Sequence, residues 1–220
     1  MNGIWILLLL LSSAALPVIV VFFWFRAGKF RITSPWFLAS LAAGIISLLP
    51  AALIQNLFPH RSTDGFWPLL FGVFIRIALV EEASRIATLL PMLKTMERRQ
   101  SLNSSLYAAF GLVAGLGFAA AENAFYGTAD INITLLRVFT AAPLHGACGI
   151  RAGITVYHLK QRPQRSFFLF LFSVLIHGAY NLLIISPALP SFSALLVAYA
   201  AFFSSIAFFK NTEENIPKLY

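Results

Sequence analysis

The sequence has few charged residues and very little cysteine. Only 11% of its 220 residues are Asp, Glu, Lys or Arg, whereas 59% are hydrophobic and the mean hydropathy is +0.81. The single cysteine, Cys148, excludes an intramolecular disulfide. This composition lies far outside the range of soluble proteins and predicts a polytopic, all-α membrane protein.

Three well-known hydrolase signatures are also missing. The chain contains no His-Glu-x-x-His, Gly-x-Gly-Asp or Gly-x-Ser-x-Gly stretch. No local motif therefore indicates zinc, aspartyl or serine chemistry. Any reactive site must be assembled from ionisable residues that lie far apart in the sequence.

Apolar runs of about 20 residues, the length that crosses a bilayer, are the main positive signal. They predict about seven transmembrane helices, and the third and fifth are long enough to tilt or break. The spans are 3–25, 36–58, 67–93, 105–126, 132–158, 166–186 and 190–209. The joining loops are short and there is no linker or repeat, so we expect one domain over residues 1–220.

The net charge of +8 is distributed so that it orients the chain in a membrane. Eleven basic residues fall in alternate loops and the tail, against Arg61 alone in the remaining loops. The eleven are Arg26, Lys29, Arg31, Lys94, Arg98, Arg99, Lys160, Arg162, Arg165, Lys210 and Lys218. The positive-inside rule then predicts an outer N-terminus and a cytoplasmic C-terminus. The partner of this charge is the lipid bilayer, and we expect no nucleic-acid binding.

Two adjacent glutamates, Glu81 and Glu82, interrupt the third apolar run. A charged carboxylate at hydrocarbon depth costs roughly 2.5–3.5 kcal/mol on insertion scales, so such a pair must bind, pair or react. Arg85 lies three and four residues further on, which places it between them on one helix face. A neutralised cluster that only packs helices is the alternative interpretation.

Further polar residues fall inside the next three predicted spans. Glu122 lies in the fourth, His145 in the fifth, and His177 and Asn181 share one face of the sixth. Taken singly, each has an ordinary explanation as an interfacial or helix-packing group. Cys148 follows His145 by three residues, so a Cys–His nucleophile pair is a minor alternative.

A different class of function also uses intramembrane Glu and His. An ion- or proton-coupled transporter or channel relays protons through such groups. Inverted repeats would support that function, and we find none in the sequence. A membrane scaffold that retains an ancestral site is a third possibility.

Four motifs fall, in order, on four successive predicted helices: Glu81-Glu82-x-x-Arg85, Phe118-x-x-x-Glu122-Asn123, His145, and His177-x-x-x-Asn181. Together they resemble the PrsW family of intramembrane proteases, distant relatives of the CAAX-processing and bacteriocin-immunity proteases. The resemblance covers about residues 67–185. The family pattern has Lys where this chain has Arg85. The CAAX-processing branch has one more residue before its Arg and a His at the place of Glu122, which favours the PrsW side.

The resemblance implies hydrolysis of a peptide bond in a membrane-anchored protein, for example a regulator such as an anti-sigma factor, in a bacterial plasma membrane. The candidate catalytic residues are Glu81, Glu82, Arg85, Glu122, His145, His177 and Asn181. We interpret Glu81 as the base that activates water. Glu82 and Arg85 would orient Glu81.

A zinc ion is the alternative source of activated water. Its ligands would be Glu82, Glu122, His145 and His177. We expect no obligatory metal, because Arg85 beside the glutamate pair would repel a dication.

Overall fold

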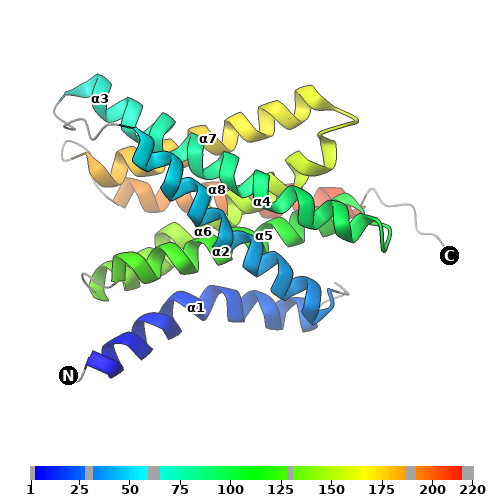
Figure 1. Ribbon diagram of the computed structural model, residues 1–220, viewed down its shortest axis with the longest axis horizontal. Helices are drawn as coiled ribbons and strands as arrows, with labels where there is room; N and C mark the ends of the chain where they lie inside the picture. The colour runs from blue at the N-terminus through cyan, green and yellow to red at the C-terminus, as the bar shows by residue number, and fades with distance from the viewer. Residues whose placement is uncertain (1–2, 28–31, 59–64, 128–130, 187–191, 215–220) are drawn as a thin grey trace.

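The protein folds as a bundle of long helices (Figure 1). The structure is a computed structural model that describes residues 3–27, 32–58, 65–127, 131–186 and 192–214. Within these ranges there is no strand. The elements are α1 (Gly3–Ala27), α2 (Ser34–Leu57), α3 (Phe66–Leu70), η1 (Phe71–Leu79), α4 (Val80–Glu97), α5 (Ser104–Gly127), α6 (Ile131–His158), α7 (Pro163–Ile185) and α8 (Phe192–Glu214).

The helix bounds confirm the predicted spans. Because α3, η1 and α4 follow one another without a gap, the described chain forms seven rod-like segments. The third segment extends to Glu97 and the last to Glu214, a few residues beyond the predicted ends. The fifth segment, α6, stays helical through Pro143, so it does not break as its length had allowed.

The outer faces of the bundle suit a lipid environment. Among the described residues, three helices are long and apolar enough to cross a membrane, namely Ser34–Leu57, Ser104–Phe125 and Pro163–Ile185. Large apolar side chains such as Leu49, Leu53 and Phe168 are exposed on α2 and α7. In water such surfaces would be unfavourable, whereas lipid chains cover them without cost.

The helices α5 and α6 form the centre of the bundle and pack unusually close together. A Cβ atom on Gly111 would overlap the carbonyl oxygen of Gly149, and one on Gly153 would overlap that of Tyr107. Small residues allow two backbones to approach in this way, as in other membrane helix pairs. The close approach sets the spacing between the polar residues further along both helices.

The third segment contains a π-helix, η1, directly before the glutamate pair. Its nine residues follow i→i+5 hydrogen bonding, which is rare and is frequently found at functional sites. This segment, which is long enough to tilt or break, therefore contains a wider helical turn and is not interrupted.

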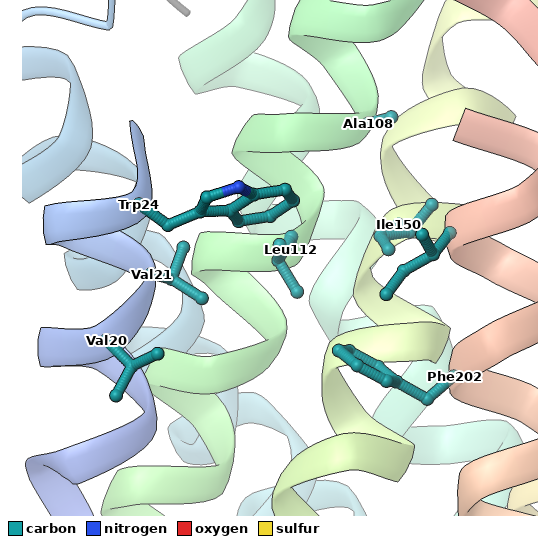
Figure 2. A pocket seen from close by; sticks show the side chains of 8 residues that line it. Val20, Val21, Trp24, Ala108, Leu112, Ile150 and Phe202 are labelled. Atoms are coloured by element: carbon teal, nitrogen blue, oxygen red, sulfur yellow. The ribbon is translucent and has the colours of Figure 1, made fainter. Parts of the chain in front are cut away.

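An apolar cavity of about 230 Å³ lies between α1, α5, α6 and α8 (Figure 2). Figure 2 shows Trp24 of α1, Leu112 of α5, Ile150 of α6 and Phe202 of α8 around it. Its wall includes none of the candidate catalytic residues, so this cavity is not the site that the motifs predict.

Candidate active site

The candidate site is a hydrogen-bonded network of side chains from α4, α5, α6 and α7. Glu81 and Glu82 lie in the first turn of α4, directly after η1. Both glutamates, Arg85, His145 and His177 are buried, with at most 5% of each residue exposed. A buried polar group needs partners, and most atoms of this cluster have them.

Both carboxylate oxygens of Glu82 are occupied. Arg85 Nη1 donates a hydrogen bond to Glu82 Oε2. His177 Nδ1 lies 2.8 Å from Glu82 Oε1. An ionised carboxylate can only accept, so Nδ1 of His177 carries the proton and donates it. Glu82 thereby fixes the orientation of the His177 ring, whose Nε2 points away from it.

Arg85 joins α4 to α6 through its second terminal nitrogen. Arg85 Nη2 lies 3.1 Å from His145 Nδ1, and its guanidinium carbon lies 4.7 Å from the centre of the Phe118 ring. A guanidinium has no acceptor, so Nδ1 of His145 must accept. When the ring is neutral, its proton is therefore on Nε2, which lies 2.9 Å from Glu122 Oε2.

Glu122 lies at the less buried end of the network and contacts two partners, His145 and Arg137. Arg137 Nη2 lies 2.6 Å from the same Oε2 atom of Glu122. Arg137 Nε also donates to Asn123 Oδ1 at 2.9 Å. The Glu122 side chain is 15% exposed, more than the other two glutamates. Both polar residues of the motif on the fourth predicted helix, Glu122 and Asn123, therefore take part in the network.

Glu81 differs from Glu82 because one of its oxygens is unused. Gln55 Nε2, from α2, donates to Glu81 Oε1 at 3.1 Å. Glu81 Oε2 is buried and accepts no hydrogen bond from the described residues. That oxygen faces His177 Nε2 at 3.6 Å. The rings of His145 and His177 meet edge to face, with centroids 4.9 Å apart.

Most of the residues singled out in the sequence meet in this network. Glu81, Glu82, Arg85, Glu122, His145 and His177 are joined by the contacts above. Asn181 lies one turn after His177 on α7 and is half-buried, and its side chain takes no part in the hydrogen bonds described above. The thiol of Cys148 faces Ser173 O at 3.9 Å, so it forms no pair with His145.

Sequence reasoning missed Gln55, which belongs to a helix outside the motif-bearing core. The sequence also did not predict that Arg137 pairs with Glu122. A polar residue near the end of an apolar span was the only available signal for Gln55. That signal does not say which carboxylate it meets.

The donor atoms of Glu81, His145 and His177 all lie within 4.8 Å of one another, and each residue is of a type that binds zinc. Glu81 and His177 fit a divalent cation well. Their free donor atoms face each other, and Glu82 supports the far nitrogen of His177 in the way common at metal sites. His145 fits poorly, because Arg85 and Glu122 occupy both of its ring nitrogens. The donor set includes Glu81 in place of the predicted Glu82 and Glu122. Both oxygens of Glu82 have other partners, and Oε2 of Glu122 is shared by His145 and Arg137.

A buried cluster of glutamates, histidines and arginine inside a bundle of apolar helices indicates a functional site within a membrane protein. Residues 33–207 match the model of a family described as "PrsW family intramembrane metalloprotease". The chain is also 23% identical over 189 residues to Protease PrsW of Clostridioides difficile (strain 630), covering 77% of this chain and 76% of that relative. No solved structure matches it.

The family match spans well over half of the chain, and the chain therefore belongs to the PrsW family of intramembrane proteases. It is an integral membrane peptidase. The resemblance noted in the four motifs is confirmed, and the matched range extends it to include α2 and most of α8.

Proposed function

We propose that the protein hydrolyses a peptide bond of a membrane-anchored protein by means of a water molecule activated by Glu81. The observation that carries the proposal is the unused oxygen of Glu81. It is buried, has no hydrogen-bond partner among the described residues and faces His177 Nε2 at 3.6 Å. A carboxylate in that position is suited to accept a proton from water.

The charges of the network support this assignment. Three ionised carboxylates and the two guanidinium groups paired with them leave a net charge of one negative unit. A proton on His177 would balance it, and Nε2 of the protonated ring would then be a donor beside Glu81. His177 is thus our candidate for the group that stabilises the oxyanion.

The proposed reaction has two steps. Glu81 Oε2 takes a proton from water while the water oxygen bonds to the carbonyl carbon, and the carbonyl π electrons move to its oxygen. His177 Nε2–H, with Asn181 one turn away, donates to that oxyanion. The oxyanion electrons then re-form the carbonyl bond, the C–N bond breaks, and the departing amine receives the proton from Glu81. His145 and Glu122 hold the opposite side of the site and steer the water.

If a divalent cation binds at Glu81 and His177, it would lower the pKa of a bound water and polarise the carbonyl. We propose that no metal is obligatory, because His145 is already committed to Arg85 and Glu122 by hydrogen bonds. Arg85, whose guanidinium contacts His145, would also oppose a second positive group in the same place.

The position of the site points to the class of substrate. The network lies within helices that are apolar on their outer faces, so the scissile bond must be presented in the bilayer or at its edge. We propose a membrane-anchored regulator, such as an anti-sigma factor, as the substrate, and a bacterial plasma membrane as the location. The name of the Clostridioides difficile relative, Protease PrsW, is in keeping with a protein substrate.

The test uses purified protein in liposomes of phosphatidylethanolamine and phosphatidylglycerol. The probes are single-span proteins with a tag at each end and varied sequence beside the span. The wild type should cleave at least one of them, whereas Glu81→Gln and His177→Ala should fold but lose cleavage. Glu97→Gln, the same change at an exposed position of α4, should remain active. Activity should survive exhaustive chelation.

Several results would contradict the proposal. If both Glu81→Gln and His177→Ala keep full activity, the proposed mechanism is wrong. If only Cys148→Ala loses activity, the thiol of Cys148 is the reacting group instead. Loss on chelation with recovery on adding zinc would replace the metal-free step. Proton flux through the same liposomes without cleavage of any probe would favour the transporter instead.

A further inference from the structure

Gln55 brings a helix outside the motif-bearing core into the active site. It lies near the C-terminal end of α2, and its side-chain nitrogen donates to Glu81 Oε1 at 3.1 Å. Glu81 can only accept when ionised, so the amide nitrogen is the end of Gln55 that faces it. Gln55 is half-buried, whereas its neighbour Asn56 is exposed.

This hydrogen bond makes the two oxygens of Glu81 unequal. Oε1 is held by Gln55, and Oε2 is left facing His177 Nε2. A carboxylate held at one oxygen cannot rotate freely about its last bond, so the other oxygen is aimed in one direction. The proposed base depends on that aim, since a proton-transfer group must be within hydrogen-bond reach of its water.

Gln55 is itself held in place through its backbone. Arg76 Nε, from η1, donates to the carbonyl oxygen of Gln55 at 3.2 Å. This carbonyl belongs to the last turn of α2, and it also accepts a hydrogen bond from the backbone N–H of Phe58 at 3.3 Å. An arginine that caps such a group stabilises the helix end. The end of α2 is thereby fastened to the segment that precedes Glu81.

The π-helix explains how Arg76 and Glu81 both reach Gln55. They are five residues apart, and in an α-helix of 3.6 residues per turn such residues point to different sides. The wider turn of η1, with i→i+5 hydrogen bonds, brings residues at this spacing closer to one face. Arg76 contacts the backbone of Gln55 and Glu81 contacts its side chain.

We propose that Gln55 is a positioning residue for Glu81, and that Arg76 on η1 fixes Gln55 for that task. The inference rests on the proposed function, in which Glu81 is the base. Gln55 touches neither water nor substrate in this role. Its contribution is to the rate of the chemical step and not to substrate binding.

The test is a comparison of kinetic constants for Gln55→Leu on the tagged single-span probe that the wild type cleaves fastest. We expect kcat to fall on the order of 10- to 100-fold, as for other misplaced catalytic groups, with KM within about twofold of the wild type. Gln55→Asn keeps the amide but withdraws it by one methylene group, and should lose kcat in the same way. Asn56→Leu, the matched change at the adjacent exposed position, should have wild-type constants.

The outcomes separate this inference from the proposed function. If Glu81→Gln is inactive while both Gln55 variants keep the wild-type kcat, the positioning role is wrong and Glu81 remains the base. If the Gln55 variants raise KM and leave kcat unchanged, Gln55 binds substrate and the inference is overturned. If Glu81→Gln is active, Glu81 is not the base, and both the proposed mechanism and the positioning role of Gln55 are wrong.

Discussion

At the scale of single residues, Arg85 links the two halves of the site. Its guanidinium contacts Glu82 on its own helix, His145 on α6 and the ring of Phe118 on α5. The sequence spacing predicted a position between Glu81 and Glu82. The structure instead pairs Arg85 with Glu82, and Glu81 with Gln55. Arg85 therefore connects α4 with α5 and α6, in addition to neutralising the charge of Glu82.

We predict that removing Arg85 alone is more harmful than removing it together with the charge of Glu82. Arg85→Met leaves a buried carboxylate without its cation, which typically costs about 3–5 kcal/mol. The double variant Glu82→Gln/Arg85→Met removes both charges and should recover much of that loss. Thermal unfolding in detergent, followed by loss of soluble protein, measures the difference. Equal melting temperatures for the single and double variants would show that the pair is not coupled.

The limits of sequence reasoning at this scale are visible in Gln55 and Asn181. Ionisable residues inside apolar runs are expensive, so Glu81, His145 and His177 could be found without a structure. Which oxygen meets which nitrogen depends on packing between helices far apart in the chain. His177 and Asn181 share a face, as predicted, but His177 Nδ1 bonds to Glu82 across the bundle.

At the scale of helices, the contact between α5 and α6 sets the distance between Glu122 and His145. Gly111, Gly115, Gly149 and Gly153 lie along this contact, each without room for a side chain. Gly111 and Gly115 can be read from the sequence as small residues that allow close helix packing. The sequence could not show that their partners are the glycines of α6. Nor could it show that η1 adopts a π-helix, because hydropathy alone does not distinguish one helical turn from another.

We predict that Gly149→Ala destabilises the protein and reduces activity by separating α5 from α6. The new Cβ would overlap the carbonyl oxygen of Gly111, and overpacking of this kind costs about 1–3 kcal/mol. Gly72→Ala is the control, since a Cβ there has nothing within 4 Å. Melting temperature and probe cleavage should both fall for Gly149→Ala and stay unchanged for Gly72→Ala. A Gly149→Ala variant as stable and active as the wild type would contradict the close contact.

At the scale of the whole molecule, the described helix ends that carry basic residues next to the loops lie at one end of the bundle. The C-terminal ends of α1 and α4 and the start of α7 lie on the same side in Figure 1, and they bear Arg26, Lys94 and Arg165. The opposite end of the bundle contains the end of α2, the start of α3 and the end of α7. The alternation of loops predicted from hydropathy therefore agrees with the arrangement of helices in space.

We predict that the basic end faces the cytoplasm, which places the N-terminus outside and the C-terminus inside. The natural Cys148 is buried, so a Cys148→Ala background serves for labelling with single cysteines. In intact cells, a membrane-impermeant maleimide should label Ser62→Cys, between α2 and α3, and should not label Ser101→Cys, between α4 and α5. Permeabilised cells should show both labels.

The reverse labelling pattern would overturn the orientation while leaving the active site unaffected, because the site depends on contacts within the bundle and not on which leaflet is outside. The orientation nevertheless decides which part of a substrate the enzyme meets. Glu122 and Arg137 form the more exposed end of the network, and α5 reaches them on the side away from the basic residues. With the predicted topology, this end of the site lies toward the outer half of the membrane. A scissile bond reaching the site by this end would then lie in the outer part of the substrate's span. Mapping the cut in a cleaved probe by mass spectrometry tests that expectation, and a cut on the cytoplasmic side would refute it.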